Sequence, residues 1–138
     1  MISLILGHKG SGKTKRLIAE VEAAVENSNG NVICVEKETL LTYEVNYRAR
    51  LVGVERYGIS GYDAFYGFIS GICAGDHDIT DILIDATLRI GGRDFNELAV
   101  FLKKLSDLSN ITETNITLTV SADAEELPKE IFDFCQQI

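Results

Sequence analysis

Proline, cysteine, histidine and tryptophan are all scarce in this chain, and their scarcity excludes several kinds of protein. One proline and no tryptophan occur among 138 residues, and no interval is rich enough in Pro, Gly or Ser to form a linker. The three cysteines, Cys34, Cys73 and Cys135, are widely spaced and odd in number, and the only histidines are His8 and His77. A disulfide framework and a zinc site are therefore not expected.

Basic side chains and long apolar runs are scarce too. The chain has 13 Lys and Arg against 21 Asp and Glu, a formal net charge of −8 that argues against nucleic acid or anionic lipid as a partner. Arg48, Arg50 and Arg56 form the one dense basic segment, which we interpret as a solvated strand, with a binding patch as the alternative. Apolar runs of five to six residues are too short to span a membrane. We expect one domain over residues 1–138, cytoplasmic and without membrane insertion.

One segment near the N-terminus matches a phosphate-binding loop. Residues 7–14 read GHKGSGKT and satisfy the pattern G-x-x-x-x-G-K-[ST] at every required position. Glycines let the backbone turn so that successive N–H groups face a phosphate. Lys13 would supply charge to the β- and γ-phosphates, and Thr14 a hydroxyl to Mg²⁺, at the positive end of a helix beginning near residue 12 or 13. The predicted cradle comprises Gly7, His8, Lys9, Gly10, Ser11, Gly12, Lys13 and Thr14.

The residues around this loop have the patterns that such a loop requires. Residues 2–6 form a short apolar run of strand length, and apolar residues recur at helical spacing over residues 17–25. The order is therefore strand, glycine-rich loop and amphipathic helix.

The rest of the chain alternates strand and helix patterns. Apolar runs predict further strands near residues 32–35, 51–54, 79–84 and 116–120. A helix is predicted over residues 61–74 with Ser60 as its N-cap, and another over residues 95–108 after a capping pair of Asp94 and Glu97. A last helix is predicted after Pro128, and its buried residues would be Ile131, Phe134, Cys135 and Ile138. This alternation predicts an α/β fold, a three-layer sandwich with a mainly parallel five-stranded sheet.

Parallel strands end at one edge of a sheet, where ligands of such folds bind. Asp85 ends the apolar stretch DILID and suits a group that holds Mg²⁺ beside Thr14. Asp81 is the competitor, but it lies about 13 Å back along an extended strand. Ser121 follows the last predicted strand, with Thr119 on the same face, and is a candidate to contact the γ-phosphate or the attacking water; ordinary polar residues of a strand are the alternative.

Glu36 follows the second predicted strand and is the predicted group that activates water, with Lys13 as the other catalytic residue. Glu38 is a rival for this role, and a solvated acidic pair is the alternative for both glutamates. Arg89 and Arg93 follow the Asp85 strand, where an arginine can reach a neighbouring subunit's phosphates or stay solvated.

With these residues in place, the chain resembles the P-loop NTPases, with Walker A over residues 7–14 and Walker B ending at Asp85. It is similar to a minimal RecA-like core and to small bacterial ATP-binding proteins. In that core, a further strand lies between the Walker A and Walker B strands and carries a polar sensor, a place that the resemblance gives to Ser121. The resemblance also implies that the glutamate after the second strand, Glu36, is catalytic.

The resemblance implies ATP and Mg²⁺ as ligands. VSAD stands where an N-K-x-D guanine-recognition sequence would follow the last strand, which disfavours GTP. We expect a slow ATP hydrolase or ATP-driven switch, with a second copy or a protein partner supplying an arginine. A phosphotransferase acting on a nucleoside or small metabolite and a non-hydrolysing, nucleotide-gated interaction module are the alternatives.

Overall fold

The computed structural model describes every residue from Met1 to Ile138 and contains one sheet of six parallel strands. Their order across the sheet is β3-β2-β4-β5-β1-β6. The strands are β1 (Ile2–Leu6), β2 (Asn31–Glu36), β3 (Ala49–Gly53), β4 (Ile79–Ile84), β5 (Asn115–Val120) and β6 (Cys135–Gln137). The predicted α/β class is confirmed, and the sheet is wholly rather than mainly parallel.

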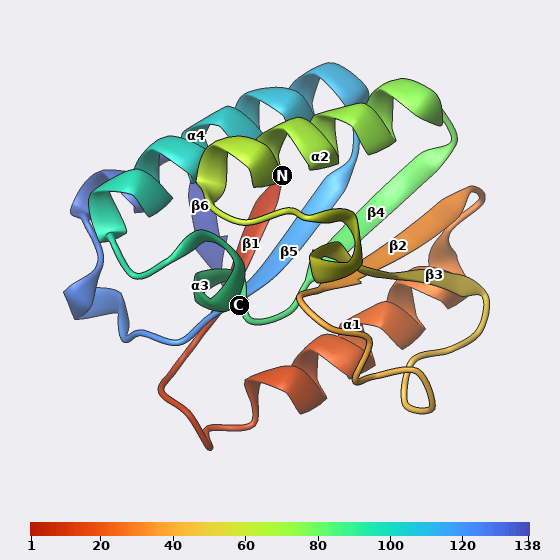
Figure 1. Cartoon of the computed structure of the whole chain (residues 1–138), viewed down its shortest axis with the longest axis horizontal. Helices are drawn as coiled ribbons and strands as arrows, with labels where there is room; N and C mark the ends of the chain where they lie inside the picture. Colours follow the sequence, from red (N-terminus) through yellow and green to blue (C-terminus); the bar gives the residue numbers. More distant parts are fainter.

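Helices cover both faces of this sheet. The helix α1 (Lys13–Asn27) lies on one face, whereas α2 (Tyr62–Gly75) and α4 (Phe95–Thr112) lie side by side on the other (Figure 1). The short helix α3 (Thr87–Gly91) connects β4 to α4 near the carboxyl ends of the strands. This arrangement is consistent with the predicted three-layer sandwich. None of the helices combines the length and apolarity that a membrane crossing requires.

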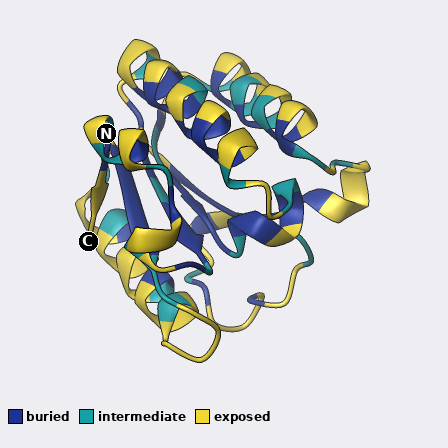
Figure 2. Ribbon diagram, turned by 90° about the vertical axis from the view of Figure 1, so that its left-hand side faces the viewer, coloured by how far each residue is buried: buried dark blue, intermediate teal, exposed yellow.

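The core explains why the strands are apolar on both faces. Successive side chains of a strand point to opposite faces, so Leu4 joins the large cluster under α2 and α4, while Ile5 joins the cluster that includes Leu17 and Val21 of α1. These four side chains are fully buried. Figure 2 shows the buried sheet enclosed by helices whose exposed faces point outward.

The predicted strand count and the predicted last helix are wrong. Residues Lys129–Asp133 form a short 3₁₀ helix, and β6 then adds a sixth strand beside β1, with Cys135 opposite Ile2. Ile138 is 37% exposed, although the predicted helix would have buried it. The physical reason is that the free edge of β1 offers unpaired backbone groups, and Ile138 N–H donates to Leu4 O at 2.9 Å. For so short a segment, backbone hydrogen bonds to β1 stabilise a strand more than an isolated helix would be stabilised by its own.

The helix starts were predicted with mixed success. The first helix begins at Lys13, as expected, and the Asp94 carboxylate accepts hydrogen bonds from the N–H groups of Asn96 and Glu97 at the start of α4. Ser60 does not cap α2, because Gly61 is the N-cap and adopts φ +84°. This left-handed conformation suits glycine.

Strand order places four strand ends next to one another at the carboxyl edge. Because β5 lies between β1 and β4, the segments after β1, β5, β4 and β2 follow one another along this edge. The predicted site residues belong to these four segments.

Candidate functional site

The loop from Gly7 to Thr14 leaves β1, folds back on itself and enters α1. Gly10 and Gly12 have φ values of +88° and +86°, in the left-handed region that favours glycine. Gly7 has φ +144°, and a Cβ there would lie 2.5 Å from the Ser11 hydroxyl oxygen. Gly7 N–H donates to Ala122 O at 2.9 Å, which fixes the loop beside the end of β5. The loop therefore depends on glycine at the spacing seen in the sequence.

The Lys13 side chain folds back over the loop. Its Nζ donates a 3.0 Å hydrogen bond to the carbonyl oxygen of His8. This bond holds the ammonium group across the turn at the start of α1. A positive charge thus lies beside the helix N-terminus, where it adds to the field of the helix dipole.

Thr14 and Asp85 are 71 residues apart in sequence and hydrogen-bonded in the fold. The Thr14 hydroxyl lies 3.1 Å from Oδ2 of Asp85 and 3.3 Å from Oδ1. Thr119 of β5 donates a 2.7 Å hydrogen bond to the same Oδ1, and its oxygen accepts one of 2.7 Å from Ala86 N–H. Asp85 is therefore held from two sides, by Thr14 at the end of the glycine-rich loop and by Thr119 of β5.

The chain turns sharply immediately after Asp85. Ala86 adopts φ +53° and ψ +54°, a left-handed conformation that is costly for a residue with a Cβ. The hydrogen bond from Ala86 N–H to Thr119 helps to hold this turn. Thr87, the next residue, is fully buried, and its hydroxyl has no hydrogen-bond partner.

Glu36 lies beside Asp85, but its carboxylate is bound to the backbone of the following loop. Its side chain is buried, and Oε2 accepts a 3.1 Å hydrogen bond from Leu41 N–H. Burial raises the pKa of Glu36, and the negative charge of Asp85 adds to this effect, although backbone N–H groups and Arg89 oppose it. Burial, followed by the charges of Glu36 and Asp85, raises the pKa of Cys34 to about 12. Two carboxylates thus share one partly desolvated region.

Glu38 forms an ion pair within the chain. Arg89 Nη2 lies 2.8 Å from Glu38 Oε1, and both side chains are partly exposed. The pair joins the segment after β2 to α3. Arg93 forms no ion pair or hydrogen bond through its side chain.

An open cavity of about 640 Å³ joins most of the predicted site. Residues from the glycine-rich loop, Asp85 and Ser121 line it, so the structure brings these three predicted segments together. Glu36 is not among its lining residues. Glu44 also lines the cavity, although no motif or spacing in the sequence indicated it, because it lies in the loop between β2 and β3 with no periodic pattern around it. The full lining is Lys9, Gly10, Gly12, Lys13, Thr14, Lys15, Ile18, Glu44, Asp85, Ala86, Thr119 and Ser121.

The side chains that line this cavity favour two kinds of ligand, an anion and a divalent cation. The lysines at positions 9, 13 and 15 and the N-terminus of α1 favour an anion. The Thr14 hydroxyl and the Asp85 carboxylate are oxygen ligands of the kind that a hard divalent cation prefers.

His8, a member of the predicted cradle, is exposed and lies against two carboxylates. Its Nε2 is 2.6 Å from Glu126 Oε1 and 3.2 Å from Asp123 Oδ2. Possible ligand atoms of these three residues lie within 4.8 Å of one another. These contacts also connect the loop of residues 7–14 to the segment that follows β5.

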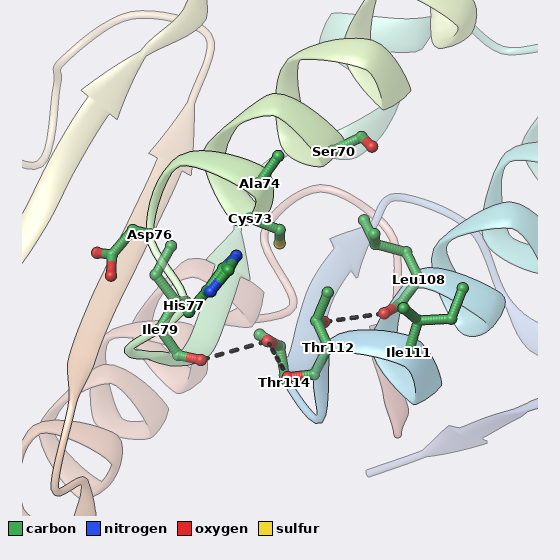
Figure 3. Close-up of a pocket in the computed structure, with 10 residues that line it drawn as sticks. All are labelled: Ser70, Cys73, Ala74, Asp76, His77, Ile79, Leu108, Ile111, Thr112 and Thr114. Atoms are coloured by element: carbon green, nitrogen blue, oxygen red, sulfur yellow. Dashed lines mark hydrogen bonds between the residues drawn. The ribbon is translucent and has the colours of Figure 1, made fainter.

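A second cavity, of about 450 Å³, lies at the opposite edge of the sheet, between the last turns of α2 and α4. Figure 3 shows Cys73 and His77 on one side of it and Leu108 and Ile111 on the other. Thr114 lies at its base and donates to Ile79 O at 3.3 Å. None of the predicted site residues contributes to this cavity.

Comparison with known proteins adds no relative to this description. No protein-family model matches the chain, and no curated protein sequence matches it.

Proposed function

We propose that this chain binds a nucleoside triphosphate together with Mg²⁺, with ATP preferred, and hydrolyses it slowly. The observation that carries the proposal is the hydrogen bond between Thr14 and Asp85 at the end of a glycine-rich loop. It joins an anion cradle to a carboxylate that lies 71 residues away in the sequence. The motif G-x-x-x-x-G-K-[ST] concerns residues 7–14 alone, so the hydrogen bond from Thr14 to Asp85 is independent support for a site that binds phosphate and a metal ion.

The phosphate loop would hold the β- and γ-phosphates. Positive φ values at three glycines allow successive backbone N–H groups to face one anion. Lys13 is near the same place and would exchange its bond to His8 O for a phosphate oxygen. Because these donors are already positioned, little reorganisation is needed on binding.

The residues present fit Mg²⁺. Thr14 Oγ1 and the carboxylate of Asp85 are both oxygen donors, and they lie within hydrogen-bond distance of each other. In this proposal Thr14 and Asp85 would hold the ion. Neutralisation of phosphate charge is the chemistry that a bound Mg²⁺ supplies at such sites.

The strand order supports the resemblance to a RecA-like P-loop core. In that core a further strand lies between those carrying Walker A and Walker B, and β5 occupies this place between β1 and β4. Ser121 follows β5 and lines the phosphate cavity. We therefore assign Ser121 to contact with the γ-phosphate.

The proposal includes a preferred nucleotide and a setting. ATP is favoured over GTP because VSAD, residues 120–123, replaces a guanine-recognition sequence. A reducing, cytoplasmic setting agrees with three buried free cysteines. No arginine lines the cavity, so an arginine that reaches the γ-phosphate would come from a second copy or a partner.

A titration tests ligand and turnover together. Melting temperature and phosphate release would be measured with ATP, ADP and GTP, each with and without Mg²⁺. At about 100 times its dissociation constant, a ligand stabilises the native state by about 2.7 kcal/mol, which should raise the melting temperature by on the order of 8 °C. We expect the largest shift with ATP and Mg²⁺. No shift with any of the nucleotides would refute the proposal.

One observation favours a second candidate, a nucleotide-gated module without turnover. The Glu36 carboxylate is bound to Leu41 N–H and does not line the cavity, so it is not placed against an attacking water. In this case ATP would change the assembly of the protein without phosphate release. ATP-dependent dimerisation in the absence of released phosphate would distinguish it from the hydrolase.

A further inference from the structure

The cavity that holds the proposed phosphate site is lined by two carboxylates, Asp85 and Glu44. Asp85 is engaged by the hydroxyls of Thr14 and Thr119. The Glu44 carboxylate is exposed and forms no hydrogen bond or ion pair. It is therefore the carboxylate at this site that is free to bind a water molecule.

The loop that carries Glu44 is fixed on both sides of this residue. Leu41 and Val45 are buried, and both belong to the core cluster under α1. The N–H groups of Glu44 and Val45 both donate to Leu41 O at 3.0 Å. Glu44 is thus displayed on a turn whose backbone is anchored, although its side chain is in solvent.

Leu41 also connects this turn to Glu36. The N–H of Leu41 donates to the Glu36 carboxylate at 3.1 Å, and its carbonyl accepts from Glu44 N–H at 3.0 Å. The buried glutamate therefore holds, through one residue, the backbone of the exposed glutamate. Its carboxylate stabilises the loop in the way that a cap stabilises a turn.

We propose that Glu44 is the residue that activates water for ATP hydrolysis and that Glu36 is a positioning residue for its loop. This inference rests on the proposed function. The water oxygen forms a bond to the γ-phosphorus, and the bond from that phosphorus to the β,γ-bridging oxygen breaks, its electron pair leaving on ADP. One proton of the water passes to the Glu44 carboxylate and then to solvent, which gives ADP, phosphate and a proton.

The charge of Glu44 has a second consequence. A carboxylate that faces a bound triphosphate repels it in the ground state, at the same time as it serves as a base in the reaction. Glu44→Gln should therefore reduce turnover by about 100-fold or more while it tightens ATP binding by about two- to fivefold. A residue with only a structural role would not produce changes of opposite sign in binding and turnover.

Substitutions of Glu36 distinguish a role in positioning the Glu44 loop from a direct role in the activation of water. Glu36→Gln keeps an oxygen that accepts the Leu41 N–H, so turnover should stay within about twofold of the wild type. Glu36→Ala loses this acceptor and should reduce turnover by about tenfold, because the Glu44 turn is no longer held. Glu26→Gln, which removes the same charge from an exposed position on α1, is the matched control and should leave binding and turnover unchanged.

The experiment measures ATP affinity by calorimetry and single-turnover phosphate release for the wild type and these four variants. Calorimetry is decisive for the proposed function, because a wild type that does not bind ATP refutes that function itself. If ATP binds, unchanged turnover in Glu44→Gln overturns only the present inference. Loss of turnover in Glu36→Gln, or a wild type that binds ATP and releases no phosphate, overturns it as well.

Discussion

Thr119 donates a 2.7 Å hydrogen bond to Oδ1 of Asp85, and so joins the ends of β5 and β4. Its oxygen also accepts from Ala86 N–H, so one hydroxyl serves both the carboxylate and the turn that follows it. Thr119 is 1% exposed, and water therefore has little access to these groups. The position of the Asp85 carboxylate thus depends on a residue from the neighbouring strand.

Replacing Thr119 with Val should destabilise the protein by about 1–3 kcal/mol. Valine keeps the shape but removes the partner of the partly buried Ala86 N–H and the shorter of the two hydrogen bonds to Asp85 Oδ1. Urea unfolding of the two proteins measures the difference. Thr119→Ser, which keeps the hydroxyl, is the control and should lose no more than about 1 kcal/mol with its methyl group. A valine variant as stable as the wild type would show that this bond contributes nothing.

Replacing Lys13 with Ala should weaken nucleotide binding strongly. A charge-assisted bond to phosphate contributes about 1.5–3 kcal/mol, so we expect affinity for ATP to fall by about 10- to 150-fold. Calorimetric titration with ATP measures it. Lys103→Ala, at an exposed ion pair with Asp107 on α4, is the control. Equal ATP affinity in Lys13→Ala and the wild type would count decisively against the site.

Asp85→Asn should remove the contribution of Mg²⁺ to ATP binding. The amide keeps an oxygen for Thr119, so the fold should persist, but the negative charge beside Thr14 is lost. We expect the ratio of ATP affinities with and without Mg²⁺ to fall by about tenfold. Asp81→Asn is a matched control on the same strand, about 13 Å away, where the side chain accepts a bond from Thr80. The prediction fails if the two variants respond alike to Mg²⁺.

Glu36→Gln should make stability less sensitive to pH. Burial raises the pKa of Glu36 above its ordinary value of 4.5, so the native state favours the protonated carboxyl. The resulting stability is present below 4.5 and is lost as the pH rises through the raised pKa of the native state. Glutamine carries no charge, and this variant should therefore melt higher than the wild type at about pH 7.5, with the difference shrinking in acid. Melting curves across this range measure the effect, and a constant difference would contradict it.

Local features of the sequence were sufficient to predict much of the fold. The strand at residues 2–6, the glycine-rich loop and the start of α1 at Lys13 follow from apolar spacing and from the backbone freedom of glycine. Asp94 as the cap of α4 follows from its side chain, which reaches its own helix. Each of these features depends on residues that are close together in the chain.

Other features were missed because they depend on distant partners. Residues 131–138 carry apolar spacing that suits a helix, and only the free edge of β1 makes residues 135–137 a strand. Glu44 lies in a loop without periodicity, and only the packing of Leu41 and Val45 brings it to the cavity. Thr119 was recognised as sharing a face with Ser121, but its bond to Asp85 requires β5 to lie beside β4.

The sequence by itself determined the glycine-rich loop, the alternation of strands and helices, and the acidic residue that follows β4, because short-range spacing and backbone sterics encode them. Only the tertiary structure decided the strand order, the sixth strand and the hydrogen bonds that Asp85 accepts from Thr14 and Thr119. The reason is physical: backbone groups at strand edges and buried carboxylates must find hydrogen-bond partners, and the nearest partners in space are distant in the chain.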